Sequence, residues 1–258
     1  MRAAWLAAGT VATVIALLLS TVLLWRGFAR ARTPIDTVHR SIAFTSDKVE
    51  IRTSSGPVNL VVVPGRAGEL LITRTLRWSQ DRPVATEVWD AARSTLRLEA
   101  DCRGADQPDG PVCQADYLVS VPPETHLVAA TTRGKLTVSE AFGSVRVTSV
   151  SGNVRLDDVA GPVWARSGTG SVTGGRLAGG LADVETGSGN VDLSFAGAPA
   201  SVRAVVRTAG DVNVYVPPAA YDVTVSAPNA TVAVKRDKTS PRKITARVKA
   251  GWVSLCCR

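Results

Sequence analysis

The sequence contains little of the material from which metal and catalytic sites are built. Its 258 residues include 2 histidines and 1 methionine. The four cysteines form no CxxC pair, which excludes zinc-ribbon and thioredoxin-type motifs. No serine stands in the GxSxG pattern of a nucleophile elbow, and no glycine precedes the Lys-Ser or Lys-Thr of a phosphate loop. We therefore expect no metal site, no cofactor and no nucleophilic catalysis.

Charge is absent from residues 3–25. A helix of this length measures about 34 Å, enough to cross the roughly 30 Å hydrocarbon core of a bilayer. Trp5 and Trp25 stand near its two ends, where indole rings favour the membrane interface. The pattern predicts one N-terminal transmembrane helix, within an anchor segment of residues 1–33, in a bacterial cell membrane. Because Ala29-Arg30-Ala31 resembles a cleavage site, a removed signal peptide stays an alternative to the retained anchor.

Two signals disagree about the side of the membrane on which the body lies. Arginines outnumber other charges after the span, and the positive-inside rule would then place the body in the cytoplasm. Cys102 and Cys113 argue the opposite way, because they flank a turn-rich loop between predicted strands at 96–100 and 117–121. The spacing suits a disulfide-closed hairpin, and disulfides persist in oxidising compartments. We expect an extracytoplasmic body and keep the cytoplasmic orientation as the alternative.

The strongest pattern is a glycine every nine residues. It runs through Gly134, Gly143, Gly152, Gly161, Gly170 and Gly179, then continues out of step at Gly189 and Gly210. A branched aliphatic residue follows two positions later, as in Gly152-Asn153-Val154. Each unit reads as one short strand with a turn glycine, and two units make a coil of about 18–20 residues. The fold class predicted is all-β, a β-solenoid over residues 126–258.

The remaining chain also reads as strands. Residues 58–65 and 69–78 alternate or run apolar, and 34–125 is expected to form an N-terminal β region that includes the Cys102/Cys113 hairpin. Only Pro83 to Arg93 offers a weak helical pattern. Calcium binding of the glycine-rich β-roll kind is excluded, because valine stands where those repeats need aspartate.

Alternation also predicts which side chains point outward. One face should carry Thr137, Arg155, Thr173, Asp192 and Asn213, and the other Arg146, Trp164 and Ala182. No two carboxylates then meet at the spacing of polysaccharide hydrolases. We expect a protein that is not an enzyme, with a polysaccharide-acting β-helix enzyme as the weakest alternative.

Several segments resemble a known family. Ser151-Gly152-Asn153-Val154, Thr169-Gly170-Ser171-Val172 and Ser188-Gly189-Asn190-Val191 are similar to the recurring Ser/Thr-Gly-x-Val of the bacterial "putative adhesin" domain family, which is related to head-GIN domains. The resemblance covers about residues 40 to 255. It implies a solenoid fold and envelope proteins that carry a membrane anchor. It supplies no catalytic residues.

The net charge of +8 is concentrated at the two ends of the chain. Seven basic residues near the C-terminus are candidates for contact with an anionic surface: Lys235, Arg236, Lys238, Arg242, Lys243, Arg247 and Lys249. Anionic lipid headgroups or cell-wall polymers would suit them. Equally, such charges can protect an open sheet edge. Nucleic acid is excluded as a partner, since no stacking aromatics interleave with the basic residues.

The sequence therefore predicts a membrane-anchored extracytoplasmic protein that binds rather than catalyses, as an envelope adhesion or scaffold protein. Its partners would be the membrane, an anionic polymer or lipid, or another protein. The alternative is a cytoplasm-facing scaffold that assembles end to end, as bactofilins do. Neither the ligand nor the oligomeric state follows from the sequence.

Overall fold

The computed structural model describes residues 13–25, 33–53, 56, 58–101, 111–140 and 143–257. The chain divides into two units, Met1–Pro34 and Ile35–Arg258. In the first unit, residues 13–25 are α-helical. Among the described residues, no helix is long and apolar enough to cross a membrane. The first part of the predicted anchor, up to residue 12, lies outside the described residues.

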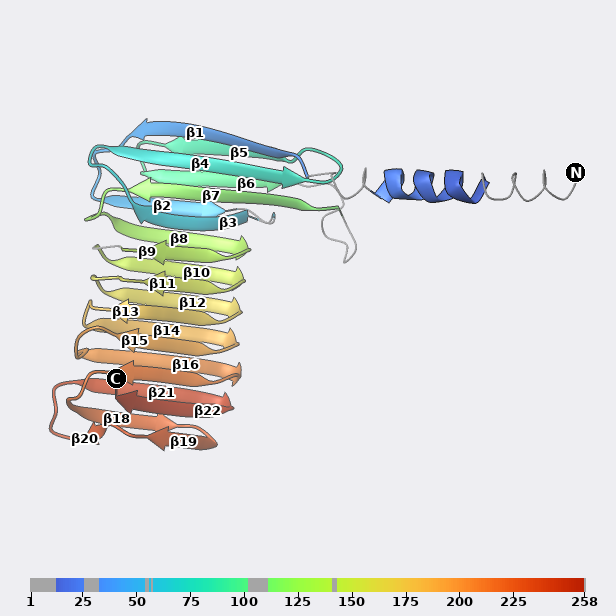
Figure 1. The fold of residues 1–258 in the computed structure, drawn as a ribbon. Coiled ribbons are helices and arrows are strands. Elements are labelled where there is room, and N and C mark those ends of the chain that lie inside the picture. The colour runs from blue at the N-terminus through green and yellow to red at the C-terminus, as the bar shows by residue number, and fades with distance from the viewer. Residues whose placement is uncertain are drawn as a thin grey trace, which may run out of the picture. The chain divides into compact units, whose positions relative to one another are not determined.

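The second unit is all-β and its described strands form two eleven-stranded sheets (Figure 1). In spatial order, sheet A contains β1 (Ile35–Ala43), β4 (Glu69–Trp78), β7 (Cys113–Val121), β3 (Val58–Pro64), β9 (Leu136–Ser139), β11 (Val154–Asp157), β13 (Val172–Leu177), β15 (Val191–Phe195), β17 (Val212–Val216), β22 (Trp252–Cys257) and β19 (Asn229–Val232). Sheet B contains β20 (Lys235–Arg236), β18 (Ala220–Ser226), β21 (Lys243–Ala250), β16 (Ser201–Ala209), β14 (Leu181–Ser188), β12 (Val163–Thr169), β10 (Val145–Ser151), β8 (His126–Arg133), β2 (Lys48–Thr53), β6 (Thr95–Asp101) and β5 (Val84–Asp90).

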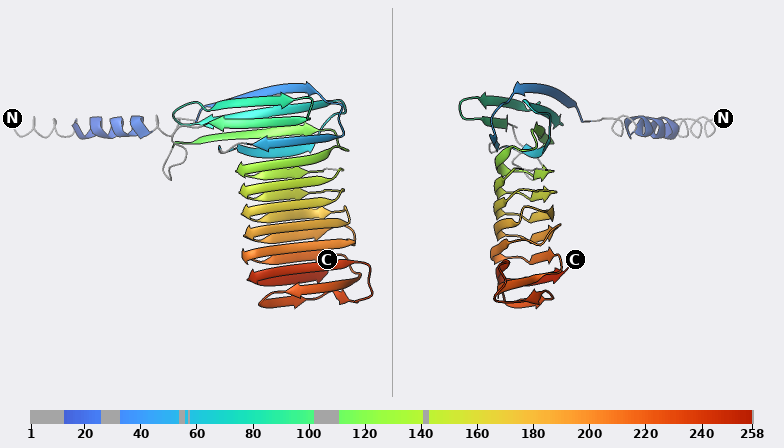
Figure 2. Two further views of the ribbon diagram at one scale, coloured as in Figure 1. Left: turned by 180° about the vertical axis from the view of Figure 1, so that it is seen from behind. Right: turned by 90° about the vertical axis from the view of Figure 1, so that its left-hand side faces the viewer.

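From β8 to β17 the chain alternates strictly between the two sheets, and each strand from β8 to β15 pairs in parallel with the strand two further along. One strand of sheet B and the next of sheet A together make one coil, and Figure 2 shows the coils seen edge-on. Leu127, Val145, Val163, Ala182 and Val202 are successive register partners in sheet B. The coils are therefore 18, 18, 19 and 20 residues long, within the expected range.

The two sheets enclose a single aliphatic strip. Within β10, Val145 and Val147 are at most 1% exposed, and Val154 and Leu156 of β11 face them with similar burial. Residues between these positions point away, because successive side chains of a strand alternate in direction. Removing such aliphatic surface from water is the main source of stability in a repeat of this kind.

The glycines that recur every nine residues form two columns in the structure. Glycines 134, 152, 170, 189, 210 and 251 lie at the turns from sheet B to sheet A, and all have positive φ. They also touch one another, since a Cβ on Gly170 would stand 2.5 Å from the carbonyl oxygen of Gly152. Gly143, Gly161 and Gly179 occupy the opposite turns without positive φ. There the constraint is close approach alone, as a Cβ on Gly179 would stand 1.9 Å from the Gly161 oxygen.

The residue after each column glycine links neighbouring coils. Asn153 Oδ1 accepts a hydrogen bond from the Ser171 backbone N–H at 2.9 Å, and Asn190 Oδ1 accepts one from the Asp211 N–H at 3.0 Å. Ser171 Oγ accepts from the Asn190 N–H in the same way, at 3.1 Å. These hydrogen bonds between coils explain why asparagine or serine follows the turn glycine in the Gly-Asn-Val and Gly-Ser-Val units.

The N-terminal strands extend the same two sheets but partly reverse direction. β1 and β4 pair antiparallel in sheet A, as do β5 and β6 in sheet B. The weak helical pattern before Arg93 is instead the strand β5. The strands on either side of Cys102 and Cys113 do not form a hairpin, because β6 lies in sheet B and β7 in sheet A. Both β3 and β4 match the predicted strands.

At the C-terminal end of the stack, the spatial order of the strands differs from their order in the chain. β21 and β22 follow β18 and β19 in the chain, yet they lie between them and the coil of β16 and β17. In the basic C-terminal segment, β20 and β21 do not pair with each other but each pair in parallel with β18. No unit boundary falls near residue 125.

Candidate functional site

The outer surface of sheet B carries the largest group of charged side chains in the coils. Register pairing aligns Arg146, Trp164, Asp183 and Arg203 in one row across β10, β12, β14 and β16. The expectation that Ala182 points outward is wrong, since Ala182 is 4% exposed and Asp183 takes the outward place. The cause is the 19-residue coil, which shifts the row by one residue relative to an 18-residue count.

A second row lies beside the first. Thr148, Arg166, Glu185, Val205 and Arg247 are register partners on successive strands of sheet B. Arg166 Nη2 donates to Asp183 Oδ2 at 2.8 Å, and Arg203 Nη1 bridges Asp183 Oδ1 at 2.9 Å and Glu185 Oε2 at 3.0 Å. Arg207 also pairs with Glu185. Three guanidinium groups thus surround two carboxylates.

These arginines keep both carboxylates ionised. Burial by itself would raise the pKa of Glu185, whose side chain is 8% exposed, but hydrogen bonds from Arg203 and Arg207 outweigh it and lower that pKa. Burial likewise opposes ionisation of Asp183, and bonds from Arg166 and Arg203 again lower its pKa. A glycosidase needs one carboxyl group with a raised pKa to act as an acid at neutral pH. Neither member of this pair meets that requirement.

Trp164 holds two of the cations. The guanidinium carbon of Arg146 lies 4.4 Å from the centre of the indole ring, and that of Arg166 lies 4.3 Å from it. Attraction between a cation and an aromatic face contributes about 0.5–1 kcal/mol at an exposed site. Arg166 has carboxylate partners as well. Arg146 is exposed. Within the described chain it has no ion pair, and its cation–π contact is with Trp164.

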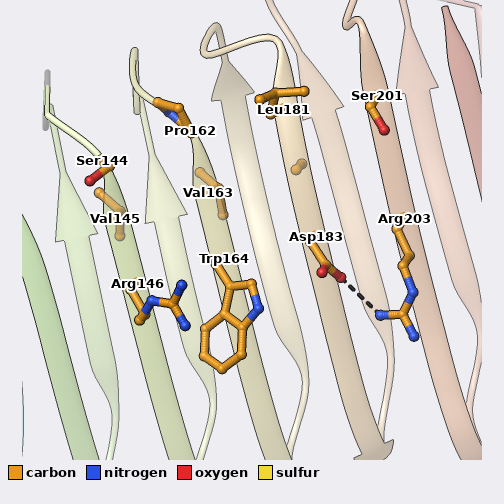
Figure 3. Close-up of a pocket in the computed structure, with 11 residues that line it drawn as sticks. Ser144, Val145, Arg146, Pro162, Val163, Trp164, Leu181, Asp183, Ser201 and Arg203 are labelled. Atoms are coloured by element: carbon orange, nitrogen blue, oxygen red, sulfur yellow. Dashed lines mark hydrogen bonds and ion pairs between the residues drawn. The ribbon is translucent and has the colours of Figure 1, made fainter.

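A shallow cavity of about 440 Å³ lies over the start of these strands. Its walls include Arg146, Trp164, Asp183 and Arg203 (Figure 3). Figure 3 shows Arg146 beside Trp164 on one side and the ion pair of Asp183 with Arg203 on the other. Hydroxyl groups and apolar side chains complete the lining at its upper rim: Ser144, Pro162, Leu181 and Ser201.

All seven predicted basic residues of the C-terminal region are exposed: Lys235, Arg236, Lys238, Arg242, Lys243, Arg247 and Lys249. Lys243, Arg247 and Lys249 alternate with buried residues of β21 and therefore project from the outer surface of sheet B. Lys235 and Arg236 form β20 at the edge of the stack.

We call the outer surface of sheet B from β10 to β21 the basic face. Its charged members are Arg146, Arg166, Asp183, Glu185, Arg203, Arg207, Lys243, Arg247 and Lys249. Seven cations thus stand against two carboxylates. Sequence reasoning found Arg146, Trp164 and the β21 cations but missed Asp183, Glu185 and Arg203. Gly189 lies one residue later than the nine-residue spacing predicts, and this shift would have revealed the longer coil.

The outer surface of sheet A is mostly uncharged. Its predicted row is confirmed by the register, which aligns Thr137, Arg155, Thr173, Asp192 and Asn213. Arg155 pairs within its own strand with Asp157 at 2.5 Å, and Asn213 Nδ2 donates to Asp192 Oδ1 at 2.7 Å. Within the described residues no three His, Cys, Asp or Glu side chains group as metal ligands on either face.

The cysteines contribute little to the described site. Cys102 lies outside the described residues, so its disulfide with Cys113, the first residue of β7, stays a prediction. Cys256 and Cys257 are not bridged to each other. Cys256 is half-buried and Cys257 is exposed.

No family model and no curated protein matches the chain. Solved structures do resemble it. A putative adhesin from Bacteroides fragilis has 13% identity and a TM-score of 0.49, covering 86% of this chain and 97% of its own. A putative cell adhesion protein from Clostridium sporogenes has 14% identity and a TM-score of 0.38, covering 86% and 100%. A putative lipid binding protein from Parabacteroides distasonis has 12% identity and a TM-score of 0.27, covering 86% and 94%. At these values the likenesses establish neither ligand nor activity.

Proposed function

We propose that this chain is a membrane-anchored, extracytoplasmic β-solenoid of the bacterial cell envelope, which binds an anionic envelope polymer and performs no catalysis. Stacked two-strand coils of 18–20 residues support the solenoid, and the Ser/Thr-Gly-x-Val repeats support membership of the "putative adhesin" family. The uncharged stretch of residues 3–25 supports the anchor. The proposal for the ligand rests on the basic face.

One observation carries the binding role. Lys243, Arg247 and Lys249 are exposed on the basic face, and none has an ion pair among the described residues. On the same surface Arg203 keeps its side chain 41% exposed although it is paired. A flat array of cations with an excess over carboxylates attracts a polyanion, and the attraction weakens with salt. The carboxylates of this face have lowered pKa values, which favours binding over acid–base chemistry.

End-to-end assembly is less favoured by the stack's edges. At the C-terminal end β19 has four residues and β20 has two, and both residues of β20 are basic. At the other end β1 has nine residues. Short, charged edge strands resist pairing with another chain, and a four-residue edge leaves most of a nine-residue edge unpaired.

The test is binding of the full-length chain, in detergent micelles, to a purified teichoic acid and separately to vesicles containing anionic lipid. Replacing Lys243, Arg247 and Lys249 with glutamine should weaken binding about a hundredfold at low salt, since each basic residue near an anionic surface contributes about 1 kcal/mol. The matched control is Arg77→Gln, Lys135→Gln and Arg155→Gln, which removes three exposed cations from the side of sheet A. Equal losses in the two triple variants would contradict a role for the basic face, as would absence of binding to both probes.

Localisation has its own test. Cys257 is exposed and not disulfide-bonded, so a membrane-impermeant maleimide should label it in intact cells without reductant if the body is extracytoplasmic. The variant with Cys256→Ser and Cys257→Ser provides the background. Labelling only after lysis would overturn the proposed orientation.

A further inference from the structure

The cavity on the basic face contains one arginine whose contacts differ from those of the neighbouring arginines. Arg166, Arg203 and Arg207 each reach a carboxylate, but Arg146 stacks on Trp164 and has no carboxylate partner among the described residues. Its charge is therefore neutralised by no group of the described chain. Because the indole contacts it at 4.4 Å, the guanidinium is nevertheless held in place at the cavity wall.

The spacing of the cations restricts the size of a ligand. Arg146 on β10 and Arg203 on β16 share one register row, with β12 and β14 between them. Neighbouring strands lie about 4.8 Å apart, so the two residues are separated by about 14 Å at the backbone. Arg146 stacks on Trp164 of β12 and Arg203 is bound to Asp183 of β14, so the two guanidinium groups are held at different positions along the row. An oligomer that lies along the stack, across the strands, can place a separate acid group on each.

The row continues beyond the cavity toward more positive charge. Arg203 pairs in register with Thr245 on β21, and Arg247 is the next residue of that strand that points outward. A chain that enters at Arg146 and passes Arg203 therefore reaches the exposed cations of β21 in one further strand. The anions of such a chain would recur at intervals along its length.

The lining indicates the chemical class of that chain. Pro162 and Leu181 offer apolar surface, Ser144 and Ser201 offer hydroxyl groups, and Asp183 is ionised and 39% exposed. The C–H groups of a sugar ring can pack against the apolar side chains. Its hydroxyl groups can hydrogen-bond to the serine hydroxyl groups and to the carboxylate of Asp183. We propose that this cavity is a subsite for an acidic oligosaccharide, with one acid group on Arg146 and another on Arg203. The inference rests on the proposed function and names its ligand class.

The test uses the full-length chain in detergent micelles with oligogalacturonates of one to six units as probes. Affinity should rise steeply once the probe is long enough to place one carboxylate on Arg146 and another on Arg203. The methyl-esterified oligomers, which lack the charge, should bind at least tenfold more weakly. Inorganic phosphate should not compete at concentrations that saturate a phosphate site.

Arg146→Gln should weaken binding of the long oligomer about tenfold, while Arg155→Gln on sheet A should leave it unchanged. Arg146→Lys should lie between these variants, because an ammonium keeps the charge but fits a planar carboxylate less well. Unchanged thermal unfolding would show that each variant is folded. The subsite is disproved if Arg146→Gln binds as the wild type does, if esterified probes bind equally, or if anionic vesicles displace the glycan.

The subsite and the proposed function fail in different ways. Loss of binding in the Lys243/Arg247/Lys249 variant together with wild-type binding in Arg146→Gln would reject the subsite and keep the basic face. Absence of binding to teichoic acid, vesicles and acidic oligosaccharides alike would reject both.

Discussion

The two outer faces of the stack share one backbone and differ in their side chains. Sheets A and B have the same coils, the same parallel pairing and the same buried aliphatic partners. Yet the outward row of sheet A alternates small uncharged residues with charged ones, as Thr137, Arg155, Thr173, Asp192 and Asn213. The row of sheet B is instead Arg146, Trp164, Asp183 and Arg203, with no small residue among them. Inward positions and turn glycines are fixed by packing, whereas outward positions are not. The face whose outward residues depart most from small polar ones is therefore the face on which to seek function.

The most severe change should affect both faces at once. Gly170 has φ +128° and a Cβ there would stand 2.5 Å from the Gly152 oxygen, so Gly170→Ala should lower the free energy of unfolding by about 3–5 kcal/mol. Gly197→Ala is the control, because nothing lies within 4 Å of its Cβ position. Circular dichroism during thermal unfolding measures both. A Gly170→Ala protein as stable as the control would contradict the role given to the glycine column.

Next in size is the loss of the buried carboxylate of sheet B. Glu185→Gln removes the partner shared by Arg203 and Arg207, and we expect a loss of about 1–3 kcal/mol, since these arginines can regain water. Asp157→Asn removes the partner of Arg155 on sheet A, an exposed pair expected to contribute less than about 0.5 kcal/mol. Urea unfolding compares the variants. Equal losses on the two faces would show that their ion pairs are equivalent.

Much of this comparison could be predicted from the sequence, and its limits have a physical cause. Glycine spacing gave the coil length, and alternation gave the outward row of sheet A, because both depend on local backbone geometry. The prediction of the outward row of sheet B failed at Ala182, because one coil there is a residue longer while its strands keep their pairing. Asp183, Glu185 and Arg203 were missed for that reason.

The ends of the stack were harder still to predict. The insertion of β21 and β22 inside β18 and β19, and the placement of β6 and β7 in different sheets, depend on contacts between distant segments. No short pattern in the sequence records them.

A smaller effect concerns the turns that both faces share. Asn153→Ala removes the acceptor for the Ser171 N–H, at an exposed turn where water can replace it. We expect a loss of about 0.5–1.5 kcal/mol, typical of one hydrogen bond. Asn153→Asp retains an acceptor at the same place and should restore most of the stability. If Asn153→Ala unfolds at the wild-type urea concentration, the ladder between coils contributes nothing measurable.

The smallest expected effect is a pH dependence of the stability that Asp183 contributes on sheet B. The pKa of Asp183 is lowered in the folded protein because hydrogen bonds from Arg166 and Arg203 outweigh its burial. A lowered folded-state pKa means stability that is present above the unfolded-state pKa of about 3.9 and is lost as pH falls through the folded value. Asp183→Asn should therefore be less stable than wild type at pH 7, by under about 1 kcal/mol because the side chain is 39% exposed. The difference should shrink below about pH 4, and urea unfolding at matched ionic strength measures it. A gap that stays constant down to pH 2.5 would show that ionised Asp183 does not stabilise the basic face.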